Sequence, residues 1–343
     1  MTIEKSTFGS LPDGRRVTRF IVGSAAGVRV AMMDYGCTLL AVEVPDRAGK
    51  AANVILSFDS LAGYLGRPMF CGTVAGRFAN RIAAGKFALD GRQFQLACNS
   101  GGHHLHGGTV GFDKVLWKAR PFRTRGAAGV RFSYVSLDGE EGYPGTLKAT
   151  VAYALNEDGE LSFEYLATAD KPTPVNLTNH AYWNLAGEGL ALEHVVSSPS
   201  RLYLPVDTGL IPTGEIASVS ATAFDFSAPK PIGRDIAKAE GGYDHCLVVD
   251  RREPGLALAC RVQDPTSGRS MEVLTTMPAF QFYSGNFLDG RSGAGGRVFA
   301  KHAAFCIEPE YFPNCVNVPH FPSCILRPGQ IWHQLTVHRF AKG

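Results

Sequence analysis

The sequence predicts an all-β fold of antiparallel strands, a sandwich or a barrel, and three observations carry this prediction. Residues 147–155 alternate apolar and polar side chains, and residues 161–167 keep the same period of two after an Asn-Glu-Asp-Gly turn. This is the pattern of a hairpin with one buried face. Long helical periodicity is scarce, and strands without crossover helices pair antiparallel. Glycine and proline are spread along the chain and not gathered in a linker, so residues 1–343 are expected to form a single domain.

The remaining predicted elements are short. Asp90-Gly91 separates residues 86–89 from 92–96 and predicts a second hairpin. Further strands fit the ranges 17–22, 27–34, 38–44, 130–136, 200–206, 245–249, 256–262, 278–283 and 331–338. Helical turns are expected only at residues 59–64 and 235–240, with one or two turns each.

Composition and charge exclude several classes of partner. The net charge is +3, and no basic block is longer than a pair of arginines, so nucleic acid and anionic membranes are not expected to bind. No apolar run reaches the roughly 20 residues of a membrane span. The N-terminal residues lack the apolar segment of a signal peptide, and none of the eight cysteines forms a C-x-x-C pair. These features predict a cytoplasmic protein with free thiols.

The first candidate segment, residues 76–82, places Arg77, Asn80 and Arg81 inside an otherwise apolar stretch. One interpretation is a surface loop whose arginines are solvated. The other is a ligand site, in which a guanidinium fork and an amide donate to ligand hydroxyls.

The second segment, residues 99–108, contains His103, His104 and His106 among glycines. Three histidines raise the possibility of a metal site, but no spacing supplies the further ligands of a closed site. Hydrogen-bonding histidines or ordinary loop histidines are the alternatives. In an extended segment His104 and His106 share one face, and the sequence favours His106 as the inward one.

The third segment, residues 175–185, reads as a strand with an uncharged polar face. Asn176, Thr178, His180 and Tyr182 share that face, and the opposite face is mainly apolar. Uncharged hydrogen-bonding groups beside an aromatic ring are typical of a sugar cleft. The alternative is a core histidine whose hydrogen bonds are made internally.

The fourth segment, residues 303–313, places Glu308 after an apolar run and before a proline. A carboxylate that loses hydration there has a raised pKa, which suits proton transfer near neutral pH. The alternative is a structural carboxylate paired with Arg77 or Arg81. Glu310 shares the parity of Glu308, but Pro309 is expected to break the strand geometry, which predicts that Glu310 is a spare or surface acid.

Two further residues are candidate ligands of sugar hydroxyls. Asp244 follows a pair of glycines, and Gln281 is an amide among aromatic residues. Either residue also fits an ordinary loop or strand position.

On these segments the chain closely resembles the aldose 1-epimerase (galactose mutarotase) family, almost from end to end. The resemblance is carried by GRFANRI (76–82), LHGG (105–108), GFDKVLW (111–117), NLTNHAYWNL (176–185), LPVDTGLIPTGE (204–215), GYDH (242–245), QFYSGNFLDG (281–290) and FCIEPEYFPNCVN (305–317). It implies a large antiparallel β-sandwich and an isomerase that interconverts the α and β anomers of free hexoses such as galactose and glucose. It implies no metal and no organic cofactor.

The resemblance also assigns roles to residues. His180 is similar in context to the general acid that protonates the ring oxygen, and Glu308 to the general base that deprotonates the anomeric hydroxyl. His106 and Arg81 are implied to position and polarise the sugar. Asp244, Gln281 and Asn80 are implied to hold hydroxyls, and the only implied partner is a small sugar bound by a monomer or homodimer.

Three other functions compete with this one. A mutarotase for phosphorylated hexoses needs a basic phosphate cradle, for which a spare arginine such as Arg77 is a candidate. A glycoside hydrolase needs two carboxylates around the scissile bond, and Asp244 and Glu308 are candidates. A non-catalytic carbohydrate-binding protein shares the cleft but does not need both the histidine and the buried glutamate.

The chain departs from the family pattern at few positions. Ser57 stands where a glycine is expected, and Cys306, Cys315 and Cys324 lie close in sequence to Glu308. None of them is expected to touch a catalytic position, although a thiol beside Glu308 suggests sensitivity to oxidation.

Overall fold

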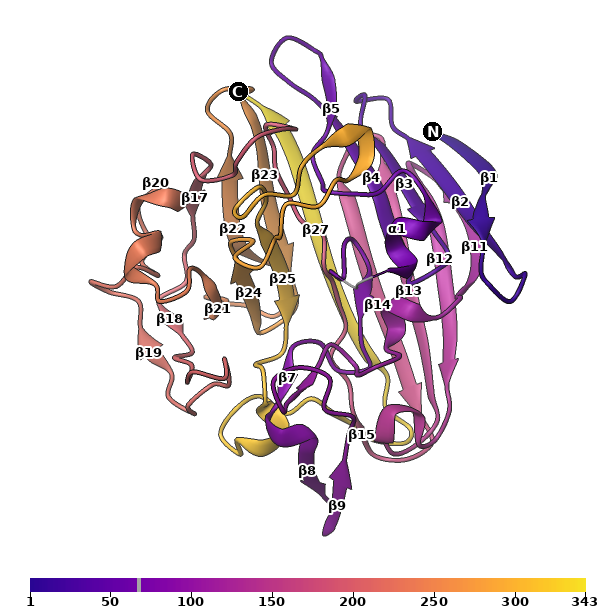
Figure 1. The fold of residues 1–343 in the computed structure, drawn as a ribbon, viewed down its shortest axis with the longest axis vertical. Coiled ribbons are helices and arrows are strands. Elements are labelled where there is room, and N and C mark those ends of the chain that lie inside the picture. The colour runs from indigo at the N-terminus through magenta and orange to yellow at the C-terminus, as the bar shows by residue number, and fades with distance from the viewer. Residues whose placement is uncertain (67–68) are drawn as a thin grey trace.

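The computed structural model describes residues 1–66 and 69–343 and has the predicted antiparallel β architecture (Figure 1). Its largest sheet orders the strands β11-β12-β13-β14-β27-β23-β22-β17-β20. The bounds are β11 (Lys118–Thr124), β12 (Ala127–Ser136), β13 (Leu147–Asn156), β14 (Leu161–Ala169), β17 (Val195–Ser197), β20 (Lys230–Pro231), β22 (Ala257–Gln263), β23 (Arg269–Thr275) and β27 (Trp332–Lys342).

Two smaller sheets accompany this large sheet. The N-terminal sheet has the order β1-β2-β3-β4-β5, and the third sheet has the order β19-β18-β21-β24-β25. Their bounds are β1 (Thr2–Ser10), β2 (Arg16–Gly23), β3 (Arg29–Met33), β4 (Thr38–Pro45), β5 (Ala51–Asn53), β18 (Leu202–Tyr203), β19 (Ala217–Ser218), β21 (Asp244–Val248), β24 (Ala279–Tyr283) and β25 (Cys306–Glu310).

Short ladders and turns complete the fold. The two-stranded ladders join β6 (Val74–Ala75) to β16 (Thr178–Asn179), β7 (Arg81–Ile82) to β10 (His104–Leu105), β8 (Lys86–Leu89) to β9 (Arg92–Gln95), and β15 (Thr173–Pro174) to β26 (Ile325–Leu326). Helical segments are the short α1 (Leu61–Leu65) and the 3₁₀ turns Ala83–Gly85, Phe112–Lys114, Glu140–Gly142, Ile232–Arg234, Ile236–Lys238, Ala294–Gly296 and Cys315–Asn317. Among the described residues, no helix combines the length and the apolar character that crossing a bilayer requires.

The core forms because the sheets bury alternate side chains against one another. Along β14 every second residue from Leu161 to Ala167 is buried, as the period of two requires. One continuous cluster of buried apolar residues draws on all three sheets, with Val22 in the N-terminal sheet, Val151 in the large sheet and Phe280 in the third sheet. In Figure 1 the N-terminal sheet lies over the β11–β14 side of the molecule, and β18, β19 and β21 lie at the opposite side. The predicted β-sandwich is confirmed.

Most of the predicted elements are present, and the differences are local. The hairpin at Asp90-Gly91 forms with both residues at positive φ (50° and 77°), as a tight two-residue turn requires. The strand predicted at 200–206 shrinks to β18, and the helical turns predicted at 59–64 and 235–240 become α1 and a 3₁₀ turn at Ile236–Lys238. The eight cysteines are free thiols in the structure, and all except Cys98 are buried.

Candidate active site

A pocket of about 230 Å³ opens between the third sheet and the loops that face it. This volume is below the roughly 300–1,000 Å³ of clefts for drug-sized ligands and suits a single sugar ring. All seven residues predicted from the sequence line it, namely Asn80, Arg81, His106, His180, Asp244, Gln281 and Glu308. The pocket therefore unites segments that are more than 200 residues apart in the chain.

The third sheet supplies the acidic floor of the pocket through its register. Gln281 of β24 pairs with Glu308 of β25, and Asp244 of β21 pairs with Tyr283 of β24. Paired and alternate residues of antiparallel strands point to one face, so these four side chains share it. Gln281 Nε2 donates to Asp244 Oδ1 at 2.6 Å, which fixes the amide beside the carboxylate.

The opposing wall comes from two turns that the β7–β10 ladder brings together. Asn80 directly precedes β7, His106 directly follows β10, and both have left-handed backbones with φ of 64° and 49°. Gly107 also has positive φ, and a Cβ there would lie 1.6 Å from the Gly76 carbonyl oxygen. Glycine is therefore required after His106, because no side chain fits that approach.

His180 enters the pocket just after β16, which pairs with β6. Its backbone N–H donates to the Thr73 carbonyl at 2.9 Å, and its ring stacks on Phe70 with centroids 5.9 Å apart. His180 and Tyr182 line the pocket as predicted. Asn176 and Thr178 do not line it; the regular strand covers only Thr178–Asn179, both side chains are buried, and Asn176 Nδ2 donates to the Ala79 carbonyl at 3.1 Å.

The candidate acid and base lie directly opposite each other. His180 Nε2 is 3.6 Å from Glu308 Oε2, and both side chains are buried. Burial raises the pKa of the Glu308 carboxyl well above its usual range, and the nearby Asp244 charge adds to this shift. Burial lowers the pKa of His180 to about 4. The same cause, loss of hydration, thus favours the neutral form of each partner.

The polar groups of the pocket are incompletely satisfied within the described residues. Gln281 Oε1 and Glu308 Oε2 are buried acceptors without a hydrogen-bond partner. Among the described residues, the guanidinium of Arg81 has no hydrogen-bond or ion-pair partner either, although its backbone is anchored on both sides through Asn80 and Asn314. Buried polar groups in native proteins are nearly always paired. A ligand rich in hydroxyl groups can supply the missing donors and acceptors.

Arg77 is neither solvated nor turned toward a ligand, in contrast to both interpretations of its segment. Its side chain is 1% exposed, and its guanidinium donates to the carbonyls of Pro144 and Gly145 and to both oxygens of Ser136. Burial lowers the pKa of Arg77. The residue ties the pocket wall to the strands behind it, so it cannot form a phosphate cradle or pair with Glu308.

The prediction that Glu310 is a spare or surface acid is wrong. Glu310 is completely buried, and Pro309 does not break the strand, because β25 pairs with β24 from Cys306 through Glu310. Pro309 pairs with Phe280 within this ladder, and its missing N–H is tolerated because β25 is an edge strand of the third sheet.

The cysteine prediction also needs a correction. Cys306 Sγ lies 3.6 Å from His180 Nδ1, so this thiol does touch a candidate catalytic residue. Burial raises the pKa of the Cys306 thiol well above its usual range, which keeps it protonated and unreactive. Ser57 lies outside the pocket and accepts from Asn53 Nδ2 at 3.2 Å.

The three histidines of residues 99–108 have different environments. His103 accepts the Ala84 N–H, whereas His104 is buried between the Ala97 carbonyl and the Tyr143 hydroxyl. His106 alone lines the pocket. The expectation that His104 and His106 share the face of an extended strand does not hold, because the left-handed backbone at His106 ends the alternation.

His106, His180 and Glu308 lie within 4.8 Å of one another through their ligand atoms, close enough to hold a metal ion. The hydrogen bonding of His106 opposes that use. The Asn80 backbone N–H donates to His106 Nδ1 at 3.1 Å, so the proton of the neutral ring resides on Nε2. A metal-binding histidine normally has the reverse arrangement, with its second nitrogen donating. The site is therefore better suited to hydrogen bonding than to metal coordination.

Sequence reasoning did not identify several apolar and basic residues of the pocket. These are Met69, Phe70, Leu105, Phe287, Leu288 and Arg291, together with Tyr283. Tyr283 could have been predicted from the sequence, because it lies two residues after Gln281 on the same strand and alternate residues of a strand point to one face. Phe70 could not have been predicted, because no sequence pattern marks a left-handed backbone (φ 53°) at a bulky residue.

Comparison with known proteins places this geometry in a family. The family model described as "Aldose 1-epimerase" matches residues 19–339. The chain is 46% identical to galactose mutarotase of Bos taurus, with 99% of each chain covered. The chain belongs to the aldose 1-epimerase family. It is accordingly an isomerase that interconverts the α and β anomers of hexoses.

Solved structures of this family have the same fold. The aldose epimerase homologue from C. elegans superposes with a TM-score of 0.87 at 31% identity, over 94% of this chain and 98% of that chain. The galactose 1-epimerase from Lactobacillus acidophilus superposes with a TM-score of 0.88 at 28% identity, over 100% of this chain and 99% of that chain. The pocket described above therefore lies in an aldose 1-epimerase scaffold.

Proposed function

We propose that this aldose 1-epimerase acts on free hexoses such as galactose and glucose, with Glu308 as general base and His180 as general acid. The observation that carries the proposal is the 3.6 Å opposition of His180 Nε2 and Glu308 Oε2 in a pocket of monosaccharide size. Mutarotation requires removal of the proton on O1 and delivery of a proton to the ring oxygen O5. One acid and one base suffice, and each contributes roughly 10²–10⁴-fold.

Glu308 and His180 together hold the same number of protons before and after ring opening, because one gains a proton and the other gives one up. Glu308 as carboxylate takes the O1 proton while His180 as imidazolium protonates O5, which opens the ring to the aldehyde. The pair is then a neutral carboxylic acid and a neutral imidazole. Rotation about C1–C2 and reversal of both transfers close the other anomer. Burial favours the neutral pair, whereas the short separation favours the ion pair. These opposing effects keep both stages of the reaction accessible.

The other lining residues hold the sugar in this proposal. His106, with its proton on Nε2, and Arg81 donate to oxygens around O5 and polarise the ring opening. Asp244 and Gln281 accept from and donate to hydroxyls on the floor, and their mutual hydrogen bond fixes their direction. Asn80 uses one amide hydrogen on Glu310, and its second is available to a sugar hydroxyl.

A free sugar is favoured over a hexose phosphate because Arg77 and Arg291 already have partners within the protein. Arg77 is consumed by internal hydrogen bonds, and Arg291 at the pocket pairs with Asp289 at 2.7 Å. Arg81 alone leaves too little positive charge for a phosphate dianion beside Asp244. A purely binding role is disfavoured because sugar binding does not require two titratable groups to face each other at the reacting atoms.

We further propose that the enzyme works in the cytoplasm without metal or organic cofactor, as one domain of residues 1–343 in a monomer or homodimer. The free thiols suit a reducing compartment, and the name of the Bos taurus relative favours galactose as one substrate.

Polarimetry on freshly dissolved α-D-galactose and α-D-glucose tests the proposal. The enzyme is expected to accelerate decay of the optical rotation to the same final value, and EDTA treatment is expected to leave the rate unchanged. No acceleration on any free aldose would contradict the choice of free hexoses. Loss of activity in EDTA that zinc restores would contradict the absence of a metal.

A further inference from the structure

The side chain of Asn80 is held at both ends. Its Oδ1 accepts the backbone N–H of Arg81 at 2.8 Å, and its Nδ2 donates to Glu310 Oε1 at 2.9 Å. Asn80 has a left-handed backbone, which asparagine tolerates better than most residues because its side chain bonds locally. The bond to Glu310 thus fixes the left-handed turn at Asn80, next to the pocket residue Arg81.

The backbone of the same turn forms two hydrogen bonds with His106. The Asn80 N–H donates to His106 Nδ1 at 3.1 Å, and the His106 N–H donates back to the Asn80 carbonyl at 3.1 Å. The first bond selects the tautomer with the proton on Nε2. The ring is also kept uncharged, because burial and the charges of His180 and Arg81 lower the pKa of His106 well below its usual range. His106 is thereby a neutral donor of defined direction.

Glu310 lies behind the pocket and does not line it. It is completely buried, and its Oε2 has no hydrogen-bond partner among the described residues. The charged groups that face it are Glu308 on its own strand, Asp244 on β21 and Arg81 on β7. Within residues 1–66 and 69–343, its one hydrogen bond to a side chain is the bond to Asn80. A buried carboxyl with this single contact needs an explanation beyond packing.

We propose that Glu310 is a positioning residue for anomer interconversion, which acts through Asn80 to keep His106 a neutral donor toward the sugar. The chain of contacts runs from Glu310 Oε1 to the Asn80 amide, and from the Asn80 backbone to His106 Nδ1. The same amide holds the Arg81 N–H, so the turn also sets where β7 presents Arg81. This inference rests on the proposed role of His106 in the pocket.

A set of matched variants tests the proposal. Glu310→Gln keeps a carbonyl oxygen for Asn80 Nδ2, whereas Glu310→Met fills similar volume without an acceptor. We expect Glu310→Gln to stay within a few-fold of wild type in kcat/KM and Glu310→Met to lose about 10- to 100-fold, the range for misplacing a catalytic-site group. Asn80→Gly keeps the left-handed backbone but removes the side chain, including the amide hydrogen proposed for a sugar hydroxyl, and is expected to lose at least as much as Glu310→Met.

A double variant separates action through Asn80 from independent action. If Glu310 works through Asn80, Glu310→Met combined with Asn80→Gly is no worse than Asn80→Gly alone, because the contact that Glu310→Met breaks is already lost in that variant. Multiplication of the two losses would overturn the proposal. Asn80→Gly also keeps the test informative if Glu310→Met does not fold.

The tautomer of His106 gives a readout that a merely structural role would not move. Selective ¹⁵N labelling of the ten histidines, with His106 assigned from the His106→Gln spectrum, reports which ring nitrogen carries the proton. We expect a single Nε2–H form in wild type and Glu310→Gln, and a mixture or a titrating ring in Glu310→Met. An unchanged tautomer in Glu310→Met would overturn the proposal, as would a pH profile shifted in Glu310→Gln, which would assign Glu310 a charge effect on Glu308 instead.

Failure of the proposed function gives a different result. In that case wild-type enzyme does not accelerate mutarotation of any free hexose, while the ¹⁵N spectra still reveal whether Glu310 governs the tautomer.

Discussion

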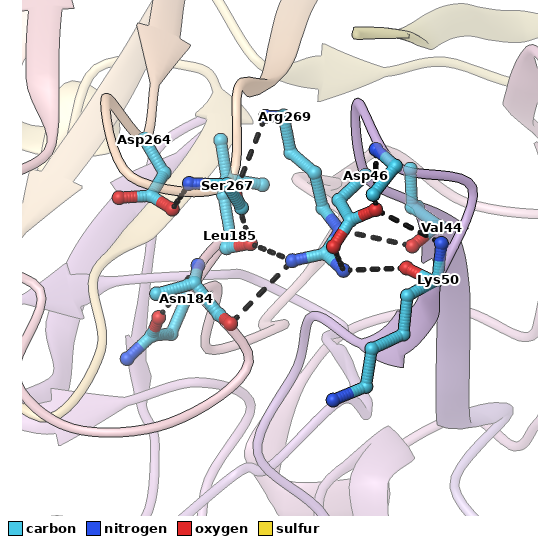
Figure 2. Close-up of polar contacts among 10 residues, drawn as sticks. Val44, Asp46, Lys50, Asn184, Leu185, Asp264, Ser267 and Arg269 are labelled. Carbon is cyan, nitrogen blue, oxygen red and sulfur yellow. Dashed lines mark hydrogen bonds and ion pairs between the residues drawn. The ribbon is translucent and has the colours of Figure 1, made fainter.

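Two buried polar clusters of this enzyme differ in how completely their hydrogen bonds are made. The first surrounds Arg269 on β23, which is 2% exposed. Its Nε donates to the Val44 carbonyl, Nη1 to Leu185 and Nη2 to Lys50, each at 2.9 Å. Figure 2 shows the guanidinium extending between these carbonyls, with the Asp46 carboxylate beside it at 3.6 Å. Every nitrogen of the guanidinium therefore has a partner.

The second cluster is the proposed active-site pocket, where two buried acceptors are left without protein partners among the described residues. Glu308 Oε2 and Gln281 Oε1 are buried and have no hydrogen-bond partner within the described part of the chain. Arg269 and these two residues are buried to a similar degree. Leaving a buried polar atom unpaired destabilises a protein by about 1–3 kcal/mol. The comparison teaches that burial alone does not mark a site in this fold. Unpaired acceptors that line a pocket, as Glu308 Oε2 and Gln281 Oε1 do, mark it better, because a ligand there can complete their hydrogen bonds, whereas His338 is also unpaired among the described residues but lies outside the pocket.

The largest expected effect follows from changing the proposed acid and base themselves. Glu308→Gln keeps the shape of the side chain, His180→Asn keeps a neutral polar side chain, and both remove the ability to transfer a proton. Each is expected to lower kcat roughly 10²–10⁴-fold while the thermal unfolding midpoint is retained or raised, because a buried titratable group is removed. Polarimetry and a thermal melt of the same sample check both effects. Wild-type turnover in a folded variant would exclude that residue from the chemistry.

Breaking the satisfied cluster is expected to have the opposite signature. Arg269→Met leaves the three carbonyls and Asp46 without their donor, and the free energy of unfolding is expected to fall by about 3–5 kcal/mol. The folded fraction keeps its kcat, because the cluster is not part of the pocket.

Urea denaturation measures the stability change, with Arg339→Met as the matched control. Arg339 pairs with Glu160 on the surface, and such exposed pairs contribute only about 0–1 kcal/mol. Equal losses in the two arginine variants would show that the Arg269 hydrogen bonds do not set its importance.

The sequence predicted the architecture and seven of the residues that line the pocket for definite physical reasons. In β13 and β14 one set of alternate side chains faces the core and the other set is more exposed, so the period of two is visible in the sequence. His180 was identifiable from the uncharged polar face of residues 175–185, and Glu308 because it places an ionisable group after an apolar run, which burial makes chemically useful.

What the sequence did not predict depends on contacts between distant segments. Arg77 and Arg81 look alike in the sequence, but only the fold brings Ser136 and Pro144 to Arg77. Glu310 looked like a surface acid because Pro309 was expected to end the strand, yet the edge position of β25 tolerates proline. Phe70 was missed because its left-handed backbone depends on tertiary packing and has no local signal.

The two arginines of residues 76–82 sharpen the comparison within a single segment. Arg81→Met is expected to lower kcat/KM by about 10- to 100-fold, the equivalent of losing charge-assisted hydrogen bonds to the sugar, with little change in stability. Arg77→Met is expected to lower the unfolding free energy by about 3 kcal/mol with near-normal kinetics of the folded enzyme. Steady-state kinetics and urea denaturation of both variants check this, and a purely thermal effect of Arg81→Met would make it a structural arginine.

The smallest effect concerns a buried histidine that the chemistry does not use. His338 on β27 stacks on Trp183 with centroids 5.0 Å apart, neither ring nitrogen has a partner among the described residues, and burial lowers its pKa to about 3. The unfolded chain therefore takes up a proton near pH 6.5, whereas the folded chain does not. The resulting stability is complete above pH 6.5 and is lost as the pH falls from there toward 3.

At pH 5 this single group is expected to lower the unfolding free energy by about 2 kcal/mol relative to neutral pH. His338→Phe keeps a ring against Trp183 and removes the titration, so the slope of stability against pH between 6.5 and 5 is expected to decrease by the contribution of one proton. The slope is the readout, because the larger ring changes the absolute stability at every pH. His180→Asn removes a second such group from the pocket, and the two changes in slope are expected to add. An unchanged slope in His338→Phe would mean that water or a rearrangement already solvates His338 in the folded state.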